Sequence, residues 1–452
     1  MPDLKKPERS ERCARACDNP PMSPLQRLAA LAVTILVALA AVLLAVRGAD
    51  PVGVAPSAAP TASATSEPSP SASRAPAQTP DGDSLAIFRE IEEAVIAIRG
   101  LPAAEIGPPE IISRDELQVE LEQLFEEDYS EEERRRDNAT LRALGLLDEG
   151  QDVAELQLQL LGDQVLGFYD DTEKRMVVVS DGGLDAQGKL TYAHEYTHAL
   201  QDAAFGLDSL ETDAVGEDDQ SMARLALIEG DATATMLAWA IRALSQQELL
   251  ELQDTPIPDT SGVPGWMIAT LEFPYLAGPT WVTQVGGGDP FDLDFDAIDD
   301  AYADAPDSTE QILDFEKWLD REQPVPVELP DLAGALGDDW VEIESTSIGQ
   351  ASIAITLEHF GIPPAEAAAA AEGWGGDRLV VAVDPNDAFA AAWILAWDQP
   401  ADAGEFVDAY GEVIRALPFP AEVLELDGGE VLVAHAADEG LLRRTVEAAR
   451  GR

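Results

Sequence analysis

Basic residues are scarce in this sequence of 452 amino acids, since 28 Lys and Arg face 86 Asp and Glu, for a formal net charge of −58. Phosphate binding needs clustered Lys and Arg, so nucleic acid is not expected as a partner. A surface this acidic is most simply a solvated one, and its charge keeps a compact chain soluble. Hydrophobic residues still make up 46% of the chain, and its length suits two to three domains with a real core.

Cysteine is almost absent. Cys13 and Cys17 are the only two, and both precede a long apolar run. Nothing after residue 17 can form a disulfide, so the large C-terminal part must fold without covalent cross-links. The Cys-x-x-x-Cys spacing suits a metal, but no other Cys or His lies nearby, which favours unligated thiols.

The apolar run extends from Leu28 to Val46 and is interrupted only by Thr34. About 20 apolar residues span the hydrocarbon core of a bilayer, which predicts a transmembrane helix over residues 28–47. Residues 1–27 carry six basic side chains against four acidic ones. The positive-inside rule therefore predicts a cytoplasmic tail over 1–27 and an extracytoplasmic remainder, as in a single-pass protein of the cell membrane.

A cleavable signal peptide is the alternative. The polar segment and the apolar run are both long for a signal peptide, and the best small-x-small site, Gly53 to Ala55, is followed by Pro56. No Cys follows the run, which excludes a bacterial lipid anchor. These features favour an uncleaved signal anchor.

Residues 48–83 are predicted to form a disordered linker. Pro, Ala, Ser and Thr occupy 25 of the 35 positions from 49 to 83. Such a segment buries too little apolar surface to offset the conformational entropy that it would lose on folding. Residues 49–452 carry 82 acidic and 21 basic residues, a net charge of −61. Anionic lipid head groups repel such a surface, so the linker would also hold the folded part away from the membrane.

The hydrophobic pattern of the remainder predicts an α+β protein with a larger domain over 84–325 and a smaller α/β domain over 326–452. The Ser113 and Glu116 pair has the capping-box spacing. The periodicity predicts helices and strands in the following segments: helices within 84–150, including 113–129, then a hairpin of strands 165–170 and 175–180, helices 188–203 and 219–245, and finally strands 379–383, 392–397 and 429–434 alternating with helices 402–416 and 437–449.

Chemistry is indicated by the segment Tyr192 to Asp202, which reads YAHEYTHALQD and contains the HExxH pattern. Histidines four residues apart lie on nearly one face of a helix, about 6 Å apart along its axis, so His194 and His198 can bind one Zn²⁺. Glu195 then stands beside the metal, where a general base is needed. The chain has only four His, so this pattern is improbable by chance.

A catalytic zinc takes three protein ligands and keeps one position open. Glu229 is the best third candidate, because it lies in an otherwise apolar, Ala-rich helical segment where an unpaired carboxylate is expensive to bury. The alternative is a buried Glu229 paired with Arg224 or Arg242. His359 and His435 lie far down the chain and have no helix-pair context.

HEYTH followed by IEGDA resembles the gluzincin group of zinc metallopeptidases, in which HExxH supplies two ligands and a downstream Glu the third. More widely, the chain resembles poorly characterised membrane-anchored prokaryotic proteins over about residues 84–420. The segments that carry this resemblance are Gly167 to Asp170, His194 to Asp202, Glu229 to Ala232, Phe273 to Gly278, Ser308 to Leu313, Gly373 to Asp377, and Trp397 with Asp398. The resemblance implies a zincin-like domain, an edge β-hairpin with active-site helices, over residues 84–325.

The chain departs from these relatives at two positions. Gluzincins often carry an acid four residues after the third ligand, where this chain has Thr233. Asp202 lies on the ligand stripe and is the expected carboxylate that orients a ligand histidine, whereas Asp231 falls on the wrong side of its helix. The relatives also have His-Pro after Glu-Gln-Ile-Leu, where this chain has Asp314 and Phe315. A histidine that stabilised an oxyanion there would be missing here.

Hydrolysis also needs a donor for the developing oxyanion. Tyr275 is the first candidate and His359 the second, although both also suit a packing role. The glycine-rich segment Gly373 to Asp377 lacks the lysine of a phosphate loop and is interpreted as a turn into strand 379–383.

Together these features predict a membrane-anchored, extracytoplasmic zinc metallopeptidase. Its metal ligands would be His194, His198 and Glu229, with Glu195 as the general base acting on a protein or peptide substrate. The alternative is a catalytically inactive zincin-like envelope protein that serves as a binding or scaffold module. The intact Glu195 favours the enzyme, because a structural metal site needs no base there.

Overall fold

The structure is a computed structural model of the chain, and it describes residues 82–180, 184–212, 214–253, 260–426 and 428–451. The cysteines, the apolar run 28–46, the predicted cytoplasmic tail and nearly all of the predicted linker lie outside these residues. Within the described part of the chain, no helix is both long and apolar enough to cross a bilayer.

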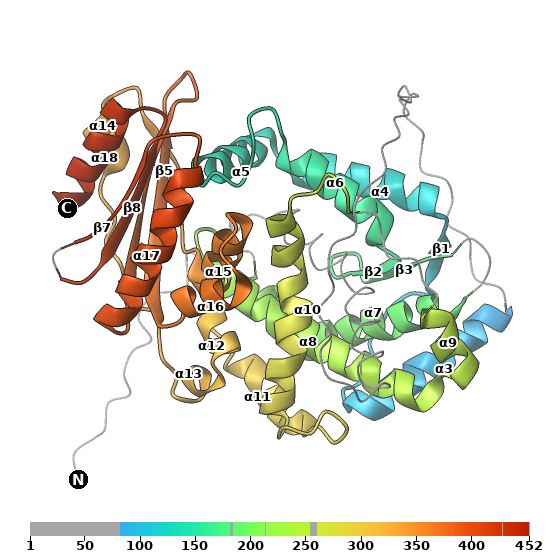
Figure 1. Cartoon of the computed structure of the whole chain (residues 1–452). Coiled ribbons are helices and arrows are strands. Elements are labelled where there is room, and N and C mark those ends of the chain that lie inside the picture. The colour runs from blue at the N-terminus through green and yellow to red at the C-terminus, as the bar shows by residue number, and fades with distance from the viewer. Residues whose placement is uncertain (1–81, 181–183, 213, 254–259, 427, 452) are drawn as a thin grey trace, which may run out of the picture.

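The first half of the described chain is mainly helical and carries a small sheet (Figure 1). Its elements are α3 (Gly82–Arg99), β1 (Glu110–Ile112), α4 (Arg114–Asp128), α5 (Glu131–Ala143), α6 (Val153–Gln164), β2 (Gly167–Asp170), β3 (Arg175–Val179), α7 (Ala186–Phe205), the 3₁₀ helix η1 (Leu207–Leu210), α8 (Asp218–Ala243), α9 (Gln246–Gln253) and α10 (Gly265–Val285).

The second half adds short helices and a larger sheet. Its elements are α11 (Phe295–Ala303), α12 (Thr309–Leu313), α13 (Phe315–Leu319), α14 (Leu332–Leu336), β4 (Val341–Thr346), α15 (Gly349–His359), α16 (Pro364–Ala371), β5 (Trp374–Val383), β6 (Phe389–Trp397), α17 (Pro400–Ala416), β7 (Ala421–Glu425), β8 (Val431–Ala436) and α18 (Glu439–Arg450). The protein is therefore of mixed α+β class, as the sequence predicted. The division into domains at residue 325 stays a prediction.

The small sheet has the strand order β1-β3-β2. β2 and β3 form the predicted antiparallel hairpin, with Phe168 opposite Val177, while β1 runs parallel to β3. β2 is an edge strand of this sheet, and α7 packs beside it. The edge of the small sheet therefore lies against α7, the helix that carries the HExxH residues.

The larger sheet has the order β4-β5-β6-β8-β7, and all of its neighbouring pairs are antiparallel. Figure 1 shows α17 on one face of this sheet and α14 with α18 on the other. Alternate residues of β5 divide accordingly, because Leu379 and Val381 pack with α17 residues while Val380 and Ala382 pack with α14 and α18. Strands covered on both faces read as continuous apolar runs, which explains the uniform hydrophobicity of this segment.

One expectation about this sheet is wrong. The segment Gly373 to Asp377 was interpreted as a turn, but β5 begins at Trp374 and pairs with β6 through this stretch, with a register shift between Trp374 and Gly376. Asp377 is buried and accepts hydrogen bonds from the backbone of Ile348 and Gly349 and from Trp393 Nε1. The prediction of a turn is wrong because glycines also occur inside strands, where they allow close approach of the backbone of another segment.

Helices α8 and α10 cross at very short range, and two glycines make the crossing possible. A methyl group at Gly230 would overlap the backbone of Gly278, and one at Gly278 would overlap the carbonyl oxygen of Ala226. Gly230 directly follows Glu229, so this crossing fixes where Glu229 sits relative to α10.

We expect Gly230→Ala to destabilise the protein by about 1–3 kcal/mol, the usual cost of overpacking a close contact. Gly411→Ala in α17 is the matched control, because no atom lies within 4 Å of a methyl group there. The control should be neutral or stabilising by up to about 1 kcal/mol, since Ala is the better helix former. Denaturant titration measures both changes, and equal stability of the two variants would contradict the close crossing.

Candidate metal centre

Helix α7 supplies two of the predicted ligands from a buried position. Asp185 caps its first turn by accepting a hydrogen bond from Gly188 N, 2.8 Å away, and the helix ends at Gly206 with a positive φ of 70°. His194 and His198 lie one helical turn apart on the face that meets α8, with exposed fractions of 0% and 7%. The helix therefore presents both imidazoles to α8 rather than to solvent.

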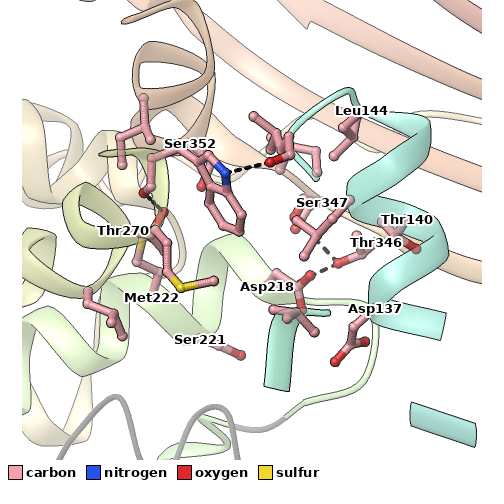
Figure 2. Close-up of a pocket in the computed structure, with 18 of the residues that line it drawn as sticks. Asp137, Thr140, Leu144, Asp218, Ser221, Met222, Thr270, Thr346, Ser347 and Ser352 are labelled. Atoms are coloured by element: carbon pink, nitrogen blue, oxygen red, sulfur yellow. Dashed lines mark hydrogen bonds between the residues drawn. The ribbon is translucent and has the colours of Figure 1, made fainter. Parts of the chain in front are cut away.

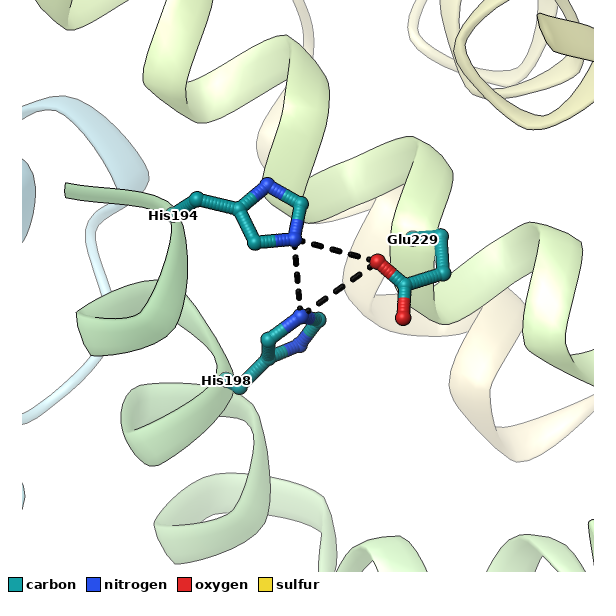
Figure 3. A group of neighbouring side chains, drawn as sticks. All are labelled: His194, His198 and Glu229. Carbon is teal, nitrogen blue, oxygen red and sulfur yellow. Dashed lines mark hydrogen bonds and ion pairs between the residues drawn. The ribbon is translucent and has the colours of Figure 1, made fainter. Parts of the chain in front are cut away.

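The structure brings His194, His198 and Glu229 together (Figure 3). Glu229 Oε2 lies 3.1 Å from His194 Nε2 and 3.4 Å from His198 Nε2, and the two Nε2 atoms are 2.9 Å apart. In a tetrahedral site with bonds of 2.0–2.1 Å, ligand atoms are about 3.3 Å apart. The three donor atoms are thus spaced so that one small metal ion could bind all three.

Three polar atoms at this centre lack partners among the described residues. Glu229 Oε1, Glu195 Oε1 and His194 Nδ1 are all buried without a hydrogen bond. A buried carboxylate oxygen without a partner is costly, and a bound cation or a substrate proton would remove that cost. Two imidazoles with one carboxylate form a donor set that suits zinc and other first-row divalent ions.

The three side chains also perturb one another electrostatically. Burial alone would raise the pKa of Glu229, but the charge of His198 and the hydrogen bonds of both imidazoles outweigh it and hold this pKa below its usual range. Burial lowers the pKa of His194, and the Glu229 carboxylate raises the pKa of His198 against its burial. The metal-free centre therefore keeps Glu229 ionised, ready to act as a ligand.

Glu195 lies next to this centre and is held by the edge strand. Its Oε2 accepts a hydrogen bond of 3.1 Å from Tyr169 N in β2, and the side chain is 2% exposed. Burial raises the pKa of Glu195 to about 8, against the attraction of His198. A raised pKa suits a carboxylate that must accept a proton and later release it.

The orientation of His198 depends on a residue that the sequence analysis missed. His198 Nδ1 lies 2.8 Å from Gln201 Oε1, which fixes the tautomer that leaves Nε2 facing Glu229. Gln201 Nε2 in turn donates to Ile228 O and to Asp231 Oδ2, each at 3.0 Å. Asp231 was set aside as lying on the wrong side of α8, yet it supports His198 through Gln201.

Asp202, the expected orienting carboxylate, does not contact either histidine. Its Oδ2 accepts hydrogen bonds from Tyr169 OH at 2.8 Å and from Lys174 Nζ. The side chain therefore ties α7 to the β2–β3 hairpin. The prediction for Asp202 is wrong because His198 hydrogen-bonds to the amide of Gln201, three residues later, and not to the carboxylate of Asp202, four residues later.

The remaining candidates lie in different places. Tyr275 of α10 is buried, and its ring is roughly parallel to that of His194 with 6.2 Å between centroids. His359 is exposed at the end of α15 against Phe360, and His435 is buried between Tyr410 and the Ala143 carbonyl. Asp314 is exposed and caps α13. Of these, only Tyr275 lies near the centre.

The alternative pairing of Glu229 with arginine is not seen. Arg224 donates to Leu210 O and lies near Glu211 and Asp307, and Arg242 is exposed. A second group of three carboxylates, Glu310, Glu322 and Asp398, surrounds Lys317. The Lys317 ammonium forms ion pairs with all three, so this group already contains its cation.

A family described as a domain of unknown function (DUF8575) matches residues 339–446. This segment contains the five-stranded sheet and lies outside the candidate metal centre. No curated protein and no solved structure matches the chain.

We expect Gln201→Leu to weaken binding of a divalent metal about 10–100-fold, because His198 would lose the acceptor that fixes its tautomer. Gln246→Leu is the control, since it makes the same change at an exposed position of α9. Competition with a chelating dye measures the affinity, and circular dichroism checks that the metal-free variants are folded. An unchanged affinity would mean that Gln201 serves packing alone.

Proposed function

We propose that this protein is a zinc-dependent metallopeptidase with a zincin-like catalytic domain. The observation that carries the proposal is the buried convergence of His194, His198 and Glu229, with Glu195 one residue after the first ligand. Zinc in such a site acts as a Lewis acid on the peptide carbonyl and lowers the pKa of water. The same donor set also accepts other divalent ions, which the test below addresses.

The side chains around the centre divide the work. His194, His198 and Glu229 hold the ion, and Gln201 keeps His198 in the required tautomer. Glu195 takes a proton from the attacking water and passes it to the leaving amine, while Tyr169 N keeps one of its oxygens in place. The Tyr275 ring lies roughly parallel to that of His194, so among the two candidate oxyanion donors, Tyr275 and His359, Tyr275 is the one beside the centre.

Glu195→Gln tests catalysis separately from metal binding. The amide keeps the size of the side chain and an oxygen for the Tyr169 N–H, but it is not basic. We expect unchanged zinc content and thermal stability, with hydrolysis of an unstructured protein reduced by about 10²–10⁴, the usual contribution of a general base. Glu93→Gln, at an exposed position in α3, should leave both unchanged.

The matching metal measurement compares the wild-type protein, which should contain one zinc ion per chain, with His194→Ala and His198→Ala, which should lose it. A folded wild-type protein that retains no zinc would refute the proposal. A protein that binds zinc but cleaves nothing, with or without Glu195, would favour the inactive binding or scaffold module instead.

We further propose that residues 28–47 anchor the protein in the cell membrane with the catalytic part outside the cytoplasm. A reporter fused after Arg452 should then be active only on the extracytoplasmic side, and the mature protein should keep residues 1–47. A mature N-terminus near Pro56 would instead establish a cleaved signal peptide.

A further inference from the structure

A cavity of about 340 Å³ adjoins the metal centre. Glu229 and Tyr275 belong to its lining, so the cavity reaches the third ligand and the ring that stands across His194. Its volume lies within the usual range for ligand-binding cavities. Figure 2 shows that its walls come from segments distant in sequence, with Thr140 on α5, Asp218 and Met222 on α8, Thr270 on α10 and Thr346 at the end of β4.

One face of α8 forms a continuous wall of this cavity. Asp218, Met222, Leu225 and Glu229 all line it, at positions i, i+4, i+7 and i+11 of the same helix. Eleven residues turn a helix by about 1,100°, close to three full turns, and advance it by about 16 Å. The wall therefore runs about 16 Å along the axis of α8, from Asp218 to the candidate ligand Glu229.

The middle of the cavity is apolar. Met222 and Leu225 of α8 line it together with three residues of α10, Trp266, Met267 and Leu271. Trp266 is held in place by a hydrogen bond of 2.7 Å from its Nε1 to Leu146 O. An extended peptide with aliphatic side chains would bury apolar surface along this stretch.

The far end of the cavity is acidic. Asp137, Asp218 and Glu344 gather there around a single cation, Arg136. Arg136 Nε lies 3.0 Å from Asp137 and 3.3 Å from Glu344, whereas Asp218 has no ion pair among the described residues. The Asp218 residue is exposed, yet desolvation by the surrounding protein raises the pKa of its carboxyl to about 6, against a hydrogen bond with Thr346. A cationic ligand group would relieve this excess of negative charge.

Polar atoms in the lining also lack partners. Thr140 Oγ1, Gln157 Oε1 and Ser221 Oγ are buried and have no hydrogen bond among the residues that the structure describes. Their residues are no more than 9% exposed. Such atoms are normally satisfied, and an elongated ligand with backbone N–H and C=O groups could satisfy them.

We propose that this cavity binds a stretch of the peptide substrate and that Asp218 pairs with a cationic group about five residues from the reacting carbonyl. An extended peptide advances about 3.3 Å per residue, so five residues span the 16 Å between Glu229 and Asp218. The cation is an ammonium or guanidinium group, supplied either by the α-amine or by a Lys or Arg side chain. The proposal rests on the peptidase function, because it assigns a substrate class to the same centre.

The charge of the whole chain supports this assignment. A formal net charge of −58 attracts cationic peptides and repels anionic ones before contact. Asp218 lies in the first turn of α8, at the end of the cavity wall opposite Glu229.

Binding is tested with the full-length, zinc-loaded protein carrying Glu195→Gln, so that peptides are not consumed. The probes are fluorescent apolar nonapeptides with one Lys at each position in turn, and norleucine as the uncharged control. We expect one register at which Lys lowers Kd about tenfold relative to norleucine. Adding Asp218→Asn should remove this preference, and adding Asp408→Asn, at an exposed position of α17, should retain it.

N-terminal acetylation separates the two sources of the cation. If a side chain is bound, the preference for Lys persists in acetylated peptides. If the α-amine is bound, Lys and norleucine peptides bind equally, and acetylation raises the Kd of both about tenfold. Either result supports the proposal when Asp218→Asn removes the effect. Binding that depends neither on Lys nor on a free α-amine, or a dependence that survives Asp218→Asn, would overturn it.

Hydrolysis by the wild-type protein is measured on the same peptides to separate the two proposals. Asp218-dependent binding without cleavage of any peptide would refute the peptidase and leave the cavity assignment standing. Cleavage without preference for cationic peptides would support the peptidase and overturn the cavity assignment.

Discussion

The carboxylate of Asp231 is the interaction on which the arrangement of the helices depends. It is fully buried in α8 and binds Arg99 of α3 at 2.8 Å, Tyr302 OH of α11 at 2.8 Å and Gln201 of α7 at 3.0 Å. Arg99 is itself only 1% exposed, so neither charge can recover its hydration if the other is lost. Breaking such a pair typically costs about 3–5 kcal/mol. One side chain thus holds four helices in register.

The candidate metal centre depends on this arrangement of helices. The Gln201 amide nitrogen donates a hydrogen bond to Asp231 and its amide oxygen lies against His198, so the buried carboxylate that joins the helices also orients a candidate ligand. Glu229 lies two residues before Asp231, and the close contact of Gly230 with Gly278 fixes the position of Glu229 relative to α10. The stability of the fold and the geometry of the centre therefore rest on the same few contacts.

Local signals in the sequence were sufficient for much of the fold. The capping box of Ser113 and Glu116, the β2–β3 hairpin and the helices α7 and α8 are all present, because each is encoded by short-range periodicity or by a cap. β4 and β7 were missed. Both are edge strands that carry two Glu each and are mostly only partly buried, so they lack the apolar run that identified β5.

The site divides in the same way. Glu229 was identified from sequence because a carboxylate in an apolar helix needs a partner, and the structure places it beside both histidines. Gln201 was not identified from sequence. Gln201 and Asp202, three and four residues after His198, both lie near it on the helix, and only the side-chain positions show which one contacts it. The cavity was also beyond sequence reasoning, since its walls join α5, α8, α10 and the β4–α15 segment through tertiary packing.

The two sheets share one hydrophobic core, and this couples parts of the chain that have no chemical relation. A single cluster of buried side chains includes Phe168 and Val177 of the small sheet, Tyr275 of α10, and Trp393 and Val433 of the large sheet. The free energy of folding is therefore common to the segment 339–446 and to helices α7 and α8, which carry the candidate metal ligands. By thermodynamic linkage, a ligand that bound only the large sheet would make unfolding of these helices more costly, without touching any side chain of the candidate centre.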